Sequence, residues 1–217
     1  MAALSLKYDP YNLIITGVGG QGNVMTSRTI GNMLSQLGLF VTIGDTFGAS
    51  QRGGSVMSHL RISSKANCSP QIPMGHAHMV VSMEPTETIR VLKDYGNPAV
   101  KVISNTRPLY PVGVISGKIS YPSTEEIETW IGQLCAKAWH VNATAEAMKI
   151  GDPVLGNVVL AGALAGTKDL PLQRDVFVAI MGNRFKGEVL QKNITAYDYG
   201  VQCVACFSII RRSSRTH

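Results

Sequence analysis

The chain has 217 residues, of which 45% are hydrophobic and 16% charged, a composition typical of one soluble globular domain. Half of its formal net charge of +6 comes from Arg211, Arg212 and Arg215, and no other basic cluster with interleaved aromatics occurs, so no nucleic-acid partner is expected. No apolar run reaches the ~18 residues of a membrane span and no leader pattern opens the sequence, so neither a membrane protein nor a secreted one is expected.

The first predicted elements form a β-α-β unit. An apolar, β-branched run at residues 13–16 predicts a strand that ends in a cluster of glycines. Apolar residues then recur at helical spacing until Gly38, which suits a helix C-terminus, and residues 39–43 predict a second strand. This order predicts a right-handed crossover between parallel strands.

The α/β alternation continues through the middle of the chain. A glycine-rich loop at residues 47–54 leads into an alternating strand at 55–62, which has one polar face. Further strands are predicted at 78–82, 99–103 and 139–141, and helices at 85–95 and from Ser123 to about Lys137. Helices at 154–165, 174–181 and 186–199 complete the prediction, a Rossmann-like α/β fold with a mostly parallel sheet and a helical C-terminal third.

The glycine cluster follows the pattern Gly-x-Gly-x-x-Gly between a strand and a helix. In this context glycines permit a tight turn, let backbone amides approach a diphosphate, and allow close helix packing. The candidate binding residues are therefore Gly17, Gly19, Gly20, Gln21 and Gly22. The alternative interpretation is that these glycines only make a tight turn.

Asp45 lies at the end of the second predicted strand, where a dinucleotide-binding domain places its ribose-binding acid. This position favours a nicotinamide or flavin dehydrogenase. Against that hypothesis, no histidine lies near a lysine, tyrosine or carboxylate in an arrangement suited to proton transfer. The sequence therefore also favours a site that another chain completes.

A second group of candidate residues follows the glycine-rich loop. Its binding residues are predicted to be Gln51, Arg52, Gly53 and Gly54. With His59 and Arg61 they supply hydrogen-bond donors and two fixed cations, which suit phosphates or carboxylates. For His59 itself, a hydrogen-bonded structural histidine is at least as good an interpretation.

The cysteines give no clear metal site. Cys203-x-x-Cys206 has metal-binding spacing, but Cys68 and Cys135 are isolated, so no metal ligands are predicted. Scattered thiols without a secretory leader predict reduced cysteines and a cytoplasmic location. Gly151-Asp152 lacks the following glycine of a thiamine-diphosphate motif, so that cofactor is not predicted on this chain.

Several of these segments together resemble a known family, the gamma subunits or domains of 2-oxoacid:ferredoxin oxidoreductases. The nearest likeness is to the small (beta) subunits of its indolepyruvate branch. The segments that carry it are residues 17–22, 51–56, 58–61 and 156–157, followed by Phe185, Lys186, Asn193, Ala196, Tyr197 and Gly200. The likeness covers a gamma-type domain at residues 12–200, leaving an N-terminal extension at 1–11 and a basic tail at 201–217.

The resemblance implies a small subunit of a multisubunit enzyme that decarboxylates a 2-oxoacid oxidatively. It implies an indolepyruvate-like aromatic substrate, coenzyme A as acyl acceptor and ferredoxin as electron acceptor. Thiamine diphosphate, Mg and [4Fe-4S] clusters are expected on a large partner subunit, with no tightly bound cofactor on this chain. A contribution to the coenzyme A site and an inactive isolated chain are also implied.

Two departures from the family pattern affect the substrate prediction. Residues 45–48 stand where the family more often has a glutamate and a small residue or histidine before the glycine, and the tail from Cys203 matches no known pattern. Some relatives use other 2-oxoacids or reduce NAD. The alternatives from other classes are a free-standing NAD(P)- or FAD-binding Rossmann dehydrogenase and a non-catalytic nucleotide-binding scaffold.

Overall fold

The computed structural model describes residues 5–48 and 54–213, with side chains described up to Ala205. The strands are β1 (Tyr11–Val18), β2 (Phe40–Phe47), β3 (Ser55–Ser63), β4 (Met79–Ser82), β5 (Lys101–Asn105) and β6 (Lys137–Val141). The helices are α1 (Asn23–Gln36), α2 (Pro85–Tyr95), α3 (Val112–Ile115), α4 (Thr124–Leu134), α5 (Ala143–Ile150), the 3-10 turn η1 (Pro153–Leu155), α6 (Gly156–Gly166), α7 (Arg174–Arg184) and α8 (Gly187–Ser213).

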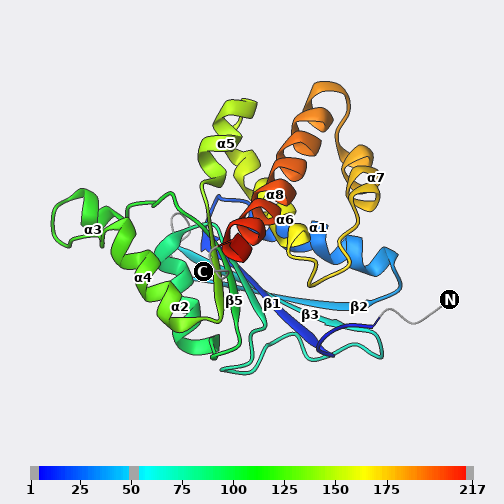
Figure 1. Cartoon of the computed structure of the whole chain (residues 1–217), viewed down its shortest axis with the longest axis horizontal. Coiled ribbons are helices and arrows are strands. Elements are labelled where there is room, and N and C mark those ends of the chain that lie inside the picture. Colours follow the sequence, from blue (N-terminus) through cyan, green and yellow to red (C-terminus); the bar gives the residue numbers. More distant parts are fainter. Residues whose placement is uncertain (1–4, 49–53, 214–217) are drawn as a thin grey trace.

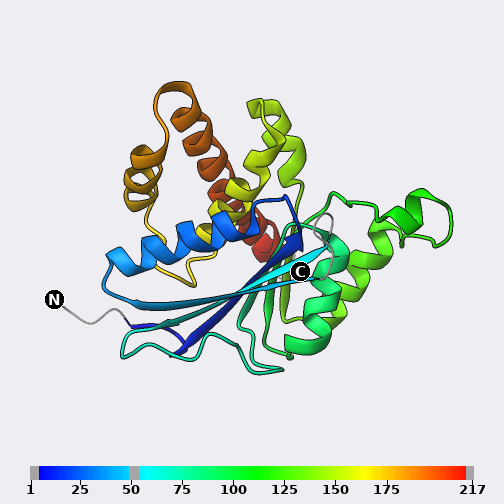
Figure 2. The same cartoon turned by 180° about the vertical axis from the view of Figure 1, so that it is seen from behind.

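One six-stranded sheet in the order β2-β3-β1-β4-β5-β6 forms the centre of the fold. Figures 1 and 2 show α1, α6, α7 and α8 on one side of this sheet and α2 and α4 on the other. The pairs β1-β4, β4-β5 and β5-β6 are parallel. The predicted α/β fold with a mostly parallel sheet, flanking helices and a helical last third is therefore confirmed.

The strands divide the buried side chains into two cores because successive residues of a strand face opposite sides. Leu13 and Ile15 of β1 join the core beneath α1, α6 and α8, whereas Ile14 between them joins the core beneath α2 and α4. All three are fully buried. Both faces of the central strand are thus covered, which explains its continuous apolar run.

The order of strands differs from the prediction in one respect. β3 pairs antiparallel with both β1 and β2, so it lies between the two strands of the predicted β-α-β unit. β2 still points in the same direction as β1, but it forms the edge of the sheet. The simple adjacent pair predicted from residues 13–43 is therefore wrong, and every residue of β2 is one strand farther from the glycine turn.

The helices were predicted less completely than the strands. The short α3 and α5 were not predicted, and α8 continues to Ser213 rather than ending at residue 199. The capping residue Ser123 is confirmed: its hydroxyl accepts from the Glu126 amide at 3.2 Å, and the Glu126 carboxylate accepts from the Ser123 amide. Of the helices in the described ranges, none has the length and apolar character to span a membrane.

Helices α6 and α8 approach each other so closely that their backbones touch. A Cβ at Gly166 of α6 would lie 2.7 Å from the carbonyl oxygen of Val201 in α8, and at Gly200 of α8 it would overlap the backbone of α6. The small residues in the apolar segment around residue 162 are therefore explained by packing within the chain. This contact fixes α6, whose first turn borders the site described next.

Candidate functional site

The glycine turn connects β1 to α1 at the carboxyl edge of the parallel strands. Gly20 and Gly22 both have positive φ, of 99° and 88°, in a backbone region that side chains rarely adopt. Gly22 is the N-cap of α1, and neither a capping side chain nor an acid in the first turn accepts from the helix amides there. Within the described part of the chain, no side chain therefore neutralises the positive end of α1 at the sheet edge.

Gln21 holds this turn against the neighbouring strand. Its Oε1 accepts a hydrogen bond from the Val18 amide at 2.7 Å, and its Nε2 donates to the Met83 carbonyl at 3.2 Å. The side chain of Asn105, at the end of β5, donates to the same Met83 carbonyl at 3.1 Å. Two amide side chains thus join the carboxyl ends of β1, β4 and β5, and Gln21 has a structural role that its place in the motif did not reveal.

A cavity of about 350 Å³ opens at this edge of the sheet. Gly20 and Gln21 line one side of it, and α5, η1 and the first turn of α6 line another. Its lining consists of Gly20, Gln21, Met83, Asn105, Arg107, Pro108, Leu109, Thr144, Met148, Pro153, Val154, Gly156, Asn157 and Leu160. The carboxyl edge between strands whose connections leave on opposite sides is where open α/β sheets bind ligands.

The charges around this cavity favour an anion. Arg107 is exposed at its rim, where its guanidinium donates to the sulfur of Met148 at 3.6 Å, and no carboxylate occurs among the described lining residues. Among the described residues, no atom lies within 4 Å of a hypothetical Cβ at Gly20. The amino end of α1, an arginine and an open glycine are the components of a phosphate site.

Asn157 connects this cavity to the glycine turn. It is 2% exposed, and its Nδ2 lies so close to Gly22 that a Cβ there would overlap it. Its Oδ1 has no hydrogen-bond partner among the described residues. The Asn157 side chain on α6 therefore sets the position of the turn, and only glycine fits at position 22.

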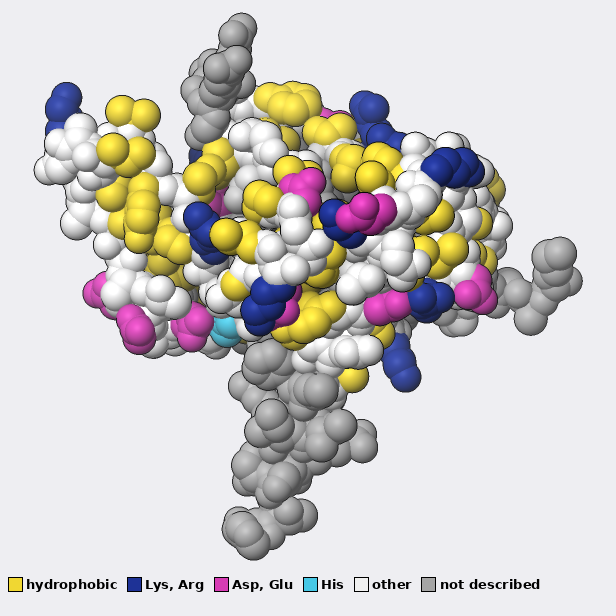
Figure 3. All heavy atoms as spheres, turned by 90° about the horizontal axis from the view of Figure 1, so that it is seen from above, with side chains coloured by type: hydrophobic (Ala, Val, Ile, Leu, Met, Phe, Trp, Pro, Cys, Tyr) yellow, Lys and Arg dark blue, Asp and Glu magenta, His cyan; other side chains and the backbone are white. Residues whose placement is uncertain are grey.

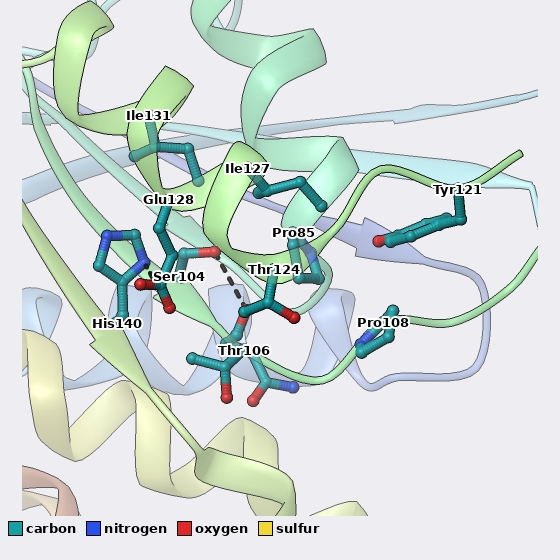
Figure 4. A pocket seen from close by; sticks show the side chains of 11 residues that line it. Pro85, Ser104, Thr106, Pro108, Tyr121, Thr124, Ile127, Glu128, Ile131 and His140 are labelled. Carbon is teal, nitrogen blue, oxygen red and sulfur yellow. Dashed lines mark hydrogen bonds and ion pairs between the residues drawn. The ribbon is translucent and has the colours of Figure 1, made fainter.

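A second, smaller pocket lies beside the cavity and shares Asn105 and Pro108 with it. Figure 4 shows that side chains from β5, β6 and α4 contribute to its lining. The His140 Nδ1 lies 4.0 Å from the Glu128 Oε1. Burial lowers the pKa of His140, and the Glu128 carboxylate opposes that shift. The pocket measures only about 10 Å³, about the room of a single water molecule, so it cannot take an organic substrate.

The structure contradicts the ribose-binding hypothesis for Asp45. β3 separates β2 from β1, and Asp45 Oδ1 accepts a hydrogen bond from Ser58 of β3 at 2.5 Å. The residue that pairs with Val18 at the end of β1 is instead Ser55 of β3. Asp45 therefore does not stand beside the glycine turn as in a dinucleotide-binding domain.

His59 and Arg61 do not join the glycine turn either, because β3 runs antiparallel to β1. His59 is 2% exposed, its Nδ1 accepts from the Ile72 amide at 3.3 Å, and burial lowers its pKa. Arg61 pairs with Asn12 at the opposite end of β1 and donates to the Asn12 Oδ1 at 3.3 Å. The structural interpretation of His59 fits the geometry, and the prediction that His59 and Arg61 join the group of donors and cations at the glycine-rich loop is wrong.

The other predicted binding residues are Gly17, Gly19 and residues 51–54. Gly17 is buried at the end of β1, where a Cβ would lie 2.8 Å from that of Met83, and the Gly19 amide donates to the Gly54 carbonyl at 2.8 Å. Gln51, Arg52 and Gly53 lie outside the described residues. Of this second group, Gly54 is described, and it is hydrogen-bonded to the glycine turn.

Cys68, Cys135 and Cys203 are free thiols, and Cys206 lies outside the described side chains. Within the described part of the chain, no group of three or more His, Cys, Asp or Glu side chains is arranged to hold a metal ion.

Sequence reasoning missed Arg107, Asn105 and Thr144 as parts of the site. Each follows a predicted strand, and polar residues directly after strands of a parallel sheet meet at one edge. That signal was present at residues 104–107 and 142–144.

Comparison with known proteins shows the family to which the chain belongs. The family model of pyruvate ferredoxin/flavodoxin oxidoreductase matches residues 12–203. The chain is similar to indolepyruvate oxidoreductase subunit IorB of Archaeoglobus fulgidus, with 34% identity over 87% of this chain and 92% of that protein. It is similar to the same subunit of Pyrococcus horikoshii, with 33% identity over 88% of this chain and 95% of that protein.

Among solved structures, the fold is similar to 2-oxoglutarate:ferredoxin oxidoreductase from Magnetococcus marinus, with a TM-score of 0.71 and 19% identity. The match covers 92% of this chain and 32% of that longer chain. The chain belongs to the pyruvate ferredoxin/flavodoxin oxidoreductase family. It is a small, gamma-type subunit of a 2-oxoacid oxidoreductase, a class whose members work in complexes of several subunits.

Proposed function

We propose that this chain works with a larger subunit in the CoA-dependent oxidation of an aromatic 2-oxoacid, and that its cavity binds the phosphates of coenzyme A. The aromatic substrate is supported by the names of the relatives, which are indolepyruvate oxidoreductase subunits. Ferredoxin is the proposed electron acceptor, as the family name suggests. The complex is proposed to act in the cytoplasm.

The observation that carries the coenzyme A proposal is the charge around the cavity. Gly20 and Gln21, which directly precede the amino end of α1, and Arg107 line a space whose described lining has no acid. These groups suit a ligand with several phosphates. The structure from Magnetococcus marinus, which has a similar fold, was solved with coenzyme A and succinyl-CoA bound.

The larger subunit is proposed to carry thiamine diphosphate, Mg and [4Fe-4S] clusters. Bound thiamine diphosphate would supply the carbanion chemistry of decarboxylation there. The part assigned to this chain is to hold the acyl acceptor, with the α1 amides and Arg107 on its phosphates. We propose that Arg52 on the neighbouring loop assists them and that the isolated chain is inactive.

The test compares coenzyme A with pantetheine, which keeps the reactive thiol but lacks the phosphates. In the assembled complex, Arg107→Ala should raise the KM for coenzyme A by about tenfold, the effect of ~1.4 kcal/mol, and leave the KM for pantetheine unchanged. Arg28→Ala, at an exposed arginine of α1 outside the cavity, is the matched control.

The two substrates also separate a phosphate contact from a general disturbance. If Arg107→Ala changed the KM for both substrates equally, or for neither, the phosphate site would not be in this cavity. The same comparison for Arg52→Ala tests the assisting role of the second arginine.

A further inference from the structure

An apolar arm projects from the body of the molecule between β5 and α4. It consists of residues 109–122 and includes the short helix α3, and Figures 1 and 2 show it standing clear of the other helices. Three aliphatic side chains at its tip are mostly exposed: Val112 at 80%, Ile115 at 75% and Ile119 at 58%. Leu109 and Tyr110 at its base are also about half exposed.

Such a concentration of exposed apolar side chains on one projection is typical of a protein-protein contact. Figure 3 shows the yellow side chains of the arm with a single cation at its tip. Isolated apolar residues on a surface need no explanation, but five within eleven positions of a projecting segment do. We propose that this arm is a docking element that inserts into an apolar groove with an acidic rim on the larger subunit of the complex.

The arm is held in place at its base. A segment that is already ordered loses little conformational entropy when it binds a partner. The buried carboxylate of Glu84 accepts hydrogen bonds from the Tyr121 hydroxyl at 2.5 Å and from the Leu109 amide at 3.4 Å. The rings of Tyr110 and Tyr121 meet edge to face. Both ends of the arm are therefore tied to one residue of the core.

The position of the arm identifies its partner. Arg107, Pro108 and Leu109 line the proposed coenzyme A cavity, and the arm begins directly from them. On the proposed function, the chemistry belongs to the larger subunit, so that subunit must approach this edge to meet the thiol. A chain that closes over the cavity then reaches the arm as well.

The charge of the arm favours a different chain over a second copy of this one. From Arg107 to Ser123 the sequence contains two cations, Arg107 and Lys118, and no acid. A contact between two arms would join two segments that carry the same cations and no acid, and like charges at an interface are unfavourable. A groove with acidic groups at its rim pairs with both cations.

The test is assembly of the complex when both subunits are produced together. The double variant Val112→Asp/Ile115→Asp should lower the affinity of this chain for the larger subunit by at least tenfold, measured by quantitative co-purification and by titration of the separated subunits. Met74→Asp, at a side chain equally exposed (74%) on the loop between β3 and β4, is the matched control and should assemble like the wild type.

Further measurements distinguish a loss of docking from a loss of folding. The thermal midpoint of each variant chain shows whether it folds, and Val112→Ser/Ile115→Ser provides a milder change if the aspartates disturb folding. Lys118→Glu should weaken assembly less than the double variant and reduce its dependence on salt.

Wild-type assembly of folded arm variants would overturn the inference, and so would a change confined to self-association of this chain. The choice of partner rests on the proposed function, but the assembly measurement is separate from the coenzyme A comparison. Loss of assembly in the arm variants together with an unchanged pantetheine comparison for Arg107→Ala would support the arm and refute the phosphate site.

Discussion

Gly162 of α6 lies directly against the backbone carbonyl of Tyr197 in α8, so that a Cβ at position 162 would overlap that oxygen. The two helices have no space between them for even a methyl group. Tyr197 is itself buried, with its ring stacked on Phe177 of α7 at a centroid distance of 4.0 Å. Like Gly200, Gly162 is therefore a position where the two helices leave no room for a side chain.

Gly162→Ala is expected to destabilise the protein by about 2–3 kcal/mol, because the added methyl group must push two backbones apart. Gly132→Ala is the matched control. Gly132 also lies within a helix, α4, but a Cβ there meets nothing within 4 Å, so its replacement should stabilise the chain by about 0.5–1 kcal/mol. Urea unfolding measures both, and equal effects would contradict the close contact.

Gln21→Ala is expected to destabilise the chain by about 1–3 kcal/mol, because it removes the acceptor for the Val18 amide and the donor to the Met83 carbonyl. Gln21→Glu keeps the acceptor for the Val18 amide but places a carboxylate oxygen against the Met83 carbonyl, so it should also destabilise the chain. Gln36→Ala, at the exposed end of α1, should change stability by less than about 0.5 kcal/mol. If Gln21→Ala were as mild as this control, Gln21 would not hold the turn.

The stability of the protein is expected to fall as the pH drops below about 6.5. Burial lowers the pKa of His59 in the folded state, while in the unfolded chain it is about 6.5. The unfolded state therefore binds the proton first, and acid favours unfolding in the interval between the two pKa values.

His59→Gln should reduce this loss. The free energy of unfolding of both proteins is measured from pH 8 to pH 5. Because burial also lowers the pKa of His78 and His140, part of the slope will remain. Parallel pH profiles for wild type and variant would show that His59 does not contribute.

Lys101 and Asp169 form a largely buried ion pair, with Nζ 2.7 Å from both carboxylate oxygens. Lys101→Met alone should destabilise the chain by about 3 kcal/mol. It leaves the Asp169 carboxylate, whose side chain is only 14% exposed, without its cation. The double variant Lys101→Met/Asp169→Leu should be less destabilised than the sum of the two single variants. Additive losses in a double-mutant cycle would show that the pair is not coupled.

Much of the fold could be predicted because local patterns determine it. The apolar run of β1, the N-cap at Ser123 and the proline at the start of α2 each act within a few residues, and each element forms where expected. The helices α3 and α5 were missed because they have only four and eight residues, too few turns for an apolar period to stand out.

The insertion of β3 could not be predicted in the same way. Its alternating residues fit either direction of pairing, and the choice depends on partners in β1 and β2 that are distant in sequence. That one choice moved Asp45, His59 and Arg61 away from the glycine turn. The errors at the site therefore share a single topological cause.

The sequence predicts one side of the candidate site, the glycine turn, but not the residues opposite it. The turn from Gly17 to Gly22 has a local sequence signature, so it could be found directly. Arg107 and Thr144 meet that turn only through the parallel order of β4, β5 and β6, and Asn157 only through the packing of α6. Their contribution follows from tertiary structure, which no short motif records.

The contact between Gly22 and Asn157 also bears on the order of events during synthesis. The glycine turn leaves the ribosome early, but the side chain that positions it comes more than 130 residues later, on a helix that α8 holds in place. A nascent chain that ends before residue 187 lacks α8 and cannot yet hold α6 against the turn. The cavity at the sheet edge is therefore expected to take its final shape only after α8 has been translated.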